Sequence, residues 1–126
     1  MGSLLPDEVL IGIRLFNQGD FFAAHEALEN AWRAEAGEIR SLYQGILQVG
    51  VGCYHLQRGN LSGAEHLFSR GIHLLKGFTQ QPVGVNVSRL LADAEALKQF
   101  VERAQQSPSL HYDLPAFPQV ELVEPD

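Results

Sequence analysis

The sequence has a single cysteine, Cys53, among its 126 residues, which excludes an internal disulfide framework and a zinc site built from several cysteines. Cys53 lies in an apolar run, where a free cysteine usually behaves as a small buried hydrophobic residue. Long apolar runs are also lacking, because the longest one, residues 42–56, is interrupted by polar side chains and is shorter than the roughly 20 residues of a membrane span. The first six residues lack the basic start and apolar core of an export signal. We therefore expect a cytoplasmic protein that does not enter a membrane.

Positive charge is scarce as well. Nine Lys and Arg residues stand against 15 Asp and Glu residues, for a formal net charge of −6. A domain this acidic lacks the basic patch that nucleic acids or anionic membrane surfaces require, so we expect neither as a partner. The composition is 45% hydrophobic and 19% charged, which is enough to fill one globular core. The sequence does not specify whether the partner is a small molecule or a protein.

Apolar residues recur at helical spacing through most of the chain. Proline, aspartate and asparagine near helix starts, and glycine at helix ends, mark the boundaries. The pattern predicts five helices, at about residues 6–19, 20–36, 38–58, 60–77 and 86–106. The predicted fold is all-α, with one compact bundle of about five helices in residues 1–107. An extended, proline-containing C-terminal tail, residues 108–126, is expected to lie along this bundle.

A weak internal repeat supports this organisation. Residues 16–24 match residues 56–64 at a constant offset, and both segments contain a glycine followed by an aspartate or asparagine. This combination ends one helix and caps the next, as in helical hairpins. Two copies are too few for a solenoid, so the repeat favours a compact bundle.

The predicted helix 20–36 carries a histidine and a carboxylate on a bulky apolar face. When residues are projected at the helical period, that face comprises Phe21, Phe22, His25, Leu28, Glu29 and Trp32. The opposite face is rich in alanine, so both faces are suited to burial. Burying a carboxylate is costly unless it is paired, hydrogen-bonded or bound to a metal. We therefore expect the His25–Glu29 pair to have polar partners.

The predicted helix 38–58 offers such partners, because Gln44, Gln48 and His55 share one stripe of an otherwise apolar helix. Its glycines Gly45 and Gly52 would allow another helix to approach closely. A short link makes this helix an antiparallel neighbour of helix 20–36. We therefore predict that His25 and Glu29 face Gln44 and Gln48, with His55 farther along, in one buried polar network.

This cluster has two interpretations. In the first, His25 and Glu29 bind a divalent metal, since a His and a Glu four residues apart present their donors on one side of a helix. Either His55 or Glu26 is the third ligand or the base, and we assign His55 as the ligand and Glu26 as the catalytic base. In the second, the polar side chains satisfy one another and fix the helix register, and the chain is a helical interaction module. The spacing H-E-x-x-E is not the zincin motif H-E-x-x-H. The sequence leaves open whether the protein is an enzyme.

A resemblance adds to the first interpretation. The run from Phe16 to Trp32 resembles the signature F-N-x-G-x-Y/F-x-x-A-H-E-x-x-E-x-x-W of a small all-helical family of unknown function. Residues 43–48 and 55–60 are similar to two further segments of that family, whereas residues 49–52 are richer in glycine. The resemblance covers about residues 10–80 and implies a five-helix bundle and an activity labelled as a predicted metal-dependent hydrolase.

Other polar residues carry weaker signals. His66, Arg70 and His73 share the polar side of the predicted helix 60–77, where we expect a solvated face. Trp32 is expected to belong to the core rather than to serve as a stacking surface.

Overall fold

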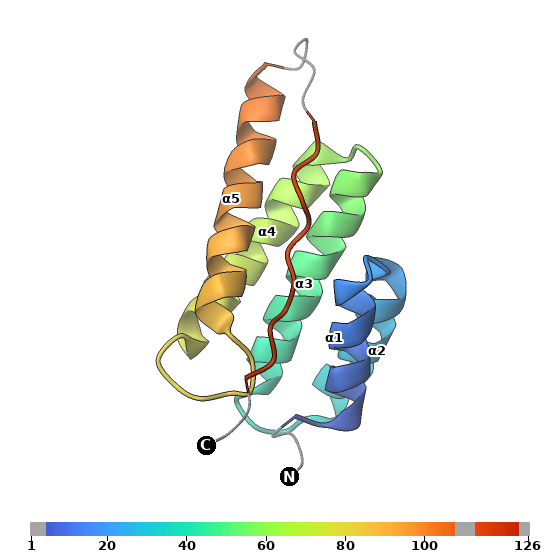
Figure 1. Cartoon of the computed structure of the whole chain (residues 1–126), viewed down its shortest axis with the longest axis vertical. Coiled ribbons are helices and arrows are strands. Elements are labelled where there is room, and N and C mark those ends of the chain that lie inside the picture. Colours follow the sequence, from blue (N-terminus) through green and yellow to red (C-terminus); the bar gives the residue numbers. More distant parts are fainter. Residues whose placement is uncertain (1–4, 108–112, 124–126) are drawn as a thin grey trace.

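The computed structural model of the chain describes residues 5–107 and 113–123. Its helices are α1 (Asp7–Asn17), α2 (Phe21–Ala34), α3 (Arg40–Gln57), α4 (Leu61–Leu75), the 3-10 helix η1 (Lys76–Phe78) and α5 (Val87–Gln106). Each α-helix packs on its neighbours in the sequence, so that α3 lies between α2 and α4 (Figure 1). The predicted all-α bundle of five helices is confirmed. Predicted and observed helix ends differ by at most two residues.

The internal repeat corresponds to two helix corners of the same design. Gly19 and Gly59 have positive φ angles of 82° and 77°, a conformation that glycine adopts without steric cost. After each glycine, an N-cap side chain accepts a hydrogen bond from a backbone N–H three residues on: Asp20 from Ala23 at 3.2 Å and Asn60 from Gly63 at 3.1 Å. These corners turn α1 onto α2 and α3 onto α4.

Glycines of α3 allow α4 to pack closely against it, as predicted. A Cβ atom at Gly52 would lie 2.6 Å from the ring of Phe68, and one at Gly45 would lie 3.1 Å from the Leu75 side chain. Cys53 is fully buried in the same part of the core, which confirms its predicted structural environment. Large side chains therefore pack directly on the α3 backbone.

The C-terminal segment 113–123 is extended and lies between α5 and the α1–α2 hairpin (Figure 1). The Phe117 ring contacts the Phe21 ring edge-on, with 5.4 Å between centroids, and Val120 is buried. Leu122 forms an isolated antiparallel bridge with Val85. Residues 108–112 and 124–126 of the predicted tail fall outside the described residues. Within the described ranges, no helix is both long and apolar enough to cross a membrane.

Candidate functional site

Helix α2 buries a face that lies between the two faces projected from the sequence. The buried residues of α2 are Phe21, Ala24, Ala27, Leu28 and Ala31. Phe22, which was placed on the buried bulky face, is 60% exposed. Small alanines allow α2 to approach α1 and α3 closely. Compared with the orientation projected from the sequence, α2 is therefore rotated about its axis, so that its bulky face lies partly outside the core.

His25, Glu29 and Arg33 form a chain of ion pairs along the outer edge of this face. His25 Nε2 lies 3.2 Å from one carboxylate oxygen of Glu29, and Arg33 donates a hydrogen bond of 2.6 Å to the other. The side chains of His25 and Glu29 are 37% and 28% exposed, respectively. Both oxygens of the Glu29 carboxylate therefore have a positively charged or polar partner near the surface.

The predicted burial of the whole polar cluster is wrong. Of its five members, only Gln48 is buried, while His25, Glu29, Gln44 and His55 are half-buried. The cause is the rotation of α2, because a face centred on alanines leaves His25 and Glu29 at the edge of the helix contact. Nearby Arg33, rather than a glutamine of α3, is the partner of Glu29.

His25 and His55 meet at a small cleft between α2 and α3. This cleft, called here the α2–α3 cleft, has a volume of about 190 Å³ and is lined by Phe21, Phe22, His25, Val51, Tyr54 and His55. The rings of Phe22 and Tyr54 are tilted against each other with centroids 6.1 Å apart, and Arg58 lies over the Tyr54 ring. His55 Nδ1 lies 3.3 Å from the side-chain amide of Asn60. Apolar rings thus form the cleft, and the two imidazoles lie among them.

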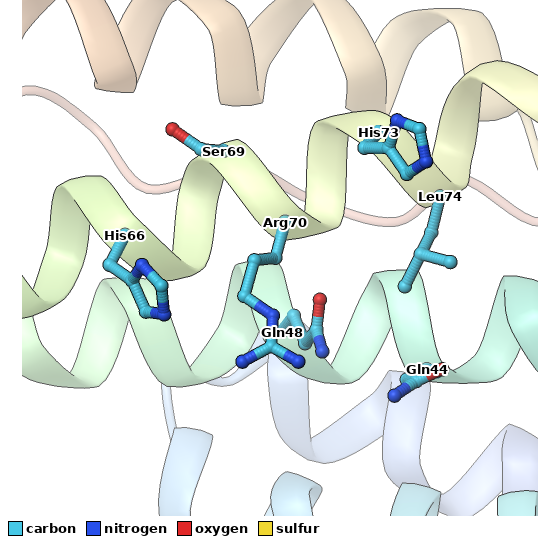
Figure 2. A pocket seen from close by; sticks show the side chains of 7 residues that line it. All are labelled: Gln44, Gln48, His66, Ser69, Arg70, His73 and Leu74. Carbon is cyan, nitrogen blue, oxygen red and sulfur yellow. The ribbon is translucent and has the colours of Figure 1, made fainter.

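Gln44 and Gln48 lie away from this cleft, contrary to the predicted arrangement. They line a groove on the α4 side of α3, together with His66, Ser69, Arg70, His73 and Leu74. Figure 2 shows Arg70 reaching from α4 to Gln48 of α3, while His66 lies farther along α4. His66, Arg70 and His73 are exposed, as predicted, but no sequence pattern indicated that they share a groove with the glutamines. Finding this groove requires the relative rotation of two helices.

Glu26 and Trp32 flank the signature residues without joining the cleft. Glu26 is exposed on α2, and its proposed role as a base stays a prediction. Trp32 is half-buried and packs against the core, in line with its expected role. Its outer ring face carries the Arg40 guanidinium, 4.7 Å from the ring centroid, an arrangement typical of a cation–π contact.

The described part of the chain contains no group of three His, Cys, Asp or Glu side chains placed to hold a metal ion. His25 and Glu29 provide two donors on one helix, but Glu29 already pairs with Arg33. These residues do not form the set of three protein ligands that a catalytic zinc centre ordinarily has. The metal-binding roles of His25, Glu29 and His55 stay predictions.

Comparison with known proteins identifies part of the chain. A family model described as "Domain of unknown function (DUF309)" matches residues 9–67. These residues are a DUF309-like segment. It contains most of α1, all of α2 and α3 and the start of α4, and so includes every residue of the α2–α3 cleft.

Two relatives contain a similar segment. The uncharacterized protein YpuF of Bacillus subtilis (strain 168) is 30% identical over 86 residues, which are 66% of this chain and 49% of the relative. An uncharacterized protein of Aquifex aeolicus (strain VF5) is 25% identical over 81 residues, 64% of this chain and 24% of the relative. The match therefore spans about half of one relative and about a quarter of the other. The resemblance to a family of unknown function is supported, whereas the hydrolase label has no counterpart in these descriptions.

Proposed function

We propose that this chain is a helical interaction module that holds an apolar side chain of a partner protein in the α2–α3 cleft. The observation that carries the proposal is Phe22, a large aromatic residue that is 60% exposed at the rim of that cleft. Exposed aromatic side chains beside apolar depressions are typical of protein-binding surfaces. His25 and His55 would supply the polar groups beside this apolar contact.

The size of the cleft favours a side chain as its occupant. Its volume is about 190 Å³. Binding sites for small molecules generally have volumes of about 300–1,000 Å³. One aromatic or branched aliphatic side chain is a better match for the smaller volume, and its burial would also cover the Phe22 ring.

The lengths of the relatives also support a module. The similar segment makes up 49% of one relative and 24% of the other, so it occurs within longer chains of different size. A compact helical unit that is combined with different additional sequence behaves as a separate domain, as an interaction module would.

In this proposal the His25–Glu29–Arg33 chain is structural. It satisfies a half-buried carboxylate and orients His25 at the edge of the cleft. The competing interpretation, a metal-dependent hydrolase, needs at least one further ligand beside His25 and Glu29, and the described residues do not offer a three-ligand group.

Selection from a random displayed peptide library on the purified protein tests the proposal. We expect the selected peptides to share an aromatic or branched aliphatic anchor. Phe22→Ala and Val51→Glu should each weaken their binding by about tenfold or more, because both changes alter the lining of the cleft. Ile11→Ala is the matched control, since Ile11 is an exposed apolar residue on α1 outside the cleft, and it should leave binding unchanged.

Two results would argue against the module. The first is a selection that enriches no peptide, or peptides whose binding is the same in the Phe22 and Val51 variants. The second is saturable zinc binding in calorimetry that is lost in His25→Ala while the fold is retained. That result would instead favour the metal-centre interpretation.

A further inference from the structure

The groove between α3 and α4 has the size and the polar lining of a small-molecule site. Its volume is about 520 Å³, and its polar lining includes Gln44, Gln48, His66, Arg70 and His73. This volume lies within the range of about 300–1,000 Å³ that is usual for small ligands. The groove is separate from the α2–α3 cleft and shares no lining residue with it.

Gln48 is a buried polar side chain whose acceptor is unsatisfied. The residue is 6% exposed, and its Oε1 atom has no hydrogen-bond partner among the residues that the structure describes. Native proteins rarely leave a buried polar atom in this condition, and each case calls for an explanation. Gln48 lines the groove but its Oε1 atom is itself buried, so a turn of the side-chain amide would bring this acceptor to the O–H or N–H group of a ligand, which would supply the missing donor.

Arg70 gives the groove its charge. Among residues 5–107 and 113–123, Arg70 forms no ion pair, whereas Arg33 and Arg89 each pair with a glutamate. No carboxylate lines the groove, although the whole chain has a formal net charge of −6. An exposed guanidinium in a groove free of acidic side chains favours an oxyanion, which it can bind through two parallel N–H donors.

His66 and His73 add further nitrogen-bearing side chains beside Arg70 along α4. They lie four residues before and three residues after Arg70, so all three side chains project on one side of the helix. Figure 2 shows Arg70 directed toward Gln48 of α3, with His66 farther along α4. The α4 side of the groove therefore offers nitrogen donors, and the α3 side offers the Gln48 acceptor.

We infer that this groove binds a small organic oxyanion that also carries a hydroxyl group. The Arg70 guanidinium holds the anionic group, and the hydroxyl donates a hydrogen bond to Gln48 Oε1. This inference is independent of the proposed interaction module.

Isothermal titration of the full chain with two probes tests the inference. Glycerol 3-phosphate carries both a phosphate and alcohol hydroxyl groups, whereas methyl phosphate has no alcohol hydroxyl group to donate to Gln48. We expect glycerol 3-phosphate to bind the wild-type protein more tightly than methyl phosphate. Arg70→Gln should weaken the binding of both probes by about tenfold or more, because a charge-assisted contact is lost.

Gln48→Met separates the hydroxyl contact from the charge. It replaces the amide by an apolar group of similar shape, so it should remove the preference for glycerol 3-phosphate and leave methyl phosphate binding unchanged. Arg14→Gln on α1 is the matched control, since it removes an equal charge from an exposed site outside the groove. It should bind both probes like the wild type.

Three results would overturn the inference: no saturable binding of either probe, equal binding by the Arg70→Gln and Arg14→Gln variants, or a preference for glycerol 3-phosphate that survives Gln48→Met. A phosphoserine peptide serves as a third probe. If it binds tenfold or more tightly than glycerol 3-phosphate, about 1.4 kcal/mol, the ligand is a protein segment and the small-molecule assignment is wrong.

Discussion

The side-chain amide of Asn17 pairs with the backbone of Val120 in the way that a neighbouring strand would. Its Nδ2 donates to the Val120 carbonyl at 3.0 Å, and its Oδ1 accepts from the Val120 N–H at 2.7 Å. Gln119 adds a third bond, from its Nε2 to the Asn17 carbonyl at 3.0 Å. The end of α1 thus anchors a segment that lies about a hundred residues away in the sequence.

We expect Asn17→Ala to lower the free energy of unfolding by about 1–3 kcal/mol, because two partly buried hydrogen bonds are lost and the Val120 backbone loses its partners. Urea unfolding measures the change. Limited proteolysis should also cut the variant within residues 113–123 faster than the wild type, since the segment is released.

Asn30→Ala serves as the control for this prediction, because Asn30 is an exposed residue of α2. Its stability should stay within about 0.5 kcal/mol of the wild type. Equal stability of the two variants would contradict an anchoring role for Asn17.

A methyl group at Gly52 is predicted to disrupt the contact between α3 and α4. The added Cβ would lie 2.6 and 2.7 Å from two atoms of the Phe68 ring. We expect Gly52→Ala to destabilise the protein by about 1–3 kcal/mol, although alanine favours the helix more than glycine does. Gly77→Ala meets nothing within 4 Å and should be nearly neutral in the same thermal melts. A neutral Gly52→Ala would mean that the α3–α4 contact adjusts without cost.

The partly exposed position of Glu29 predicts a small effect of its removal. Burial of the whole cluster, as expected from the sequence, would make Glu29→Ala strongly destabilising. The observed pair with Arg33 is partly solvated, with the Arg33 and Glu29 side chains 68% and 28% exposed, and ion pairs near the surface contribute about 0–1 kcal/mol. Chemical unfolding of Glu29→Ala distinguishes the two cases, and a loss above about 2 kcal/mol would favour a buried network.

Alkaline pH should weaken the fold through Cys53. Burial raises the pKa of its thiol well above the ordinary value of 9.0. Burial, and to a lesser extent the charge of Glu35, also raises the pKa of Tyr43. In both cases the unfolded chain releases its proton first, so the unfolded state binds fewer protons and stability falls as pH rises.

The expected loss begins near pH 9, where an unfolded thiol ionises, and its slope approaches about 1.4 kcal/mol per pH unit for one such group. Unfolding curves measured from about pH 8 to about pH 10 should show this decline in the wild type and a flatter one in Cys53→Ala. If the stability of the wild type and of Cys53→Ala fell equally with pH, the decline in stability would come from groups other than Cys53.

The fold was predictable because residues at the helix ends themselves determine where each helix begins and ends. Gly19 and Gly59 supply positive φ angles, and Asp20 and Asn60 supply caps, so each corner is specified by adjacent residues. Gly52 likewise marks a close helix approach. None of these inferences depends on how one helix is rotated against another.

The site depends on helix rotation, which the sequence does not fix. Both faces of α2 are apolar enough for burial, and only the packed structure shows that the face with Ala24 and Leu28 turns inward while Phe22 turns outward. The same ambiguity kept the groove from being predicted, because Gln48 and Arg70 line one groove only when α3 and α4 are packed together in the observed orientation. Polar residues on an apolar helix correctly indicated a polar feature of the structure, but the partners predicted for them were wrong.

The two glycine corners also have a consequence for folding. Each hairpin closes through contacts between residues near in sequence, so both can form early and rapidly. The Phe117–Phe21 and Val120–Asn17 contacts close a far longer loop. During synthesis, the side of Phe21 that Phe117 covers therefore stays exposed until the ribosome has produced the C-terminal segment.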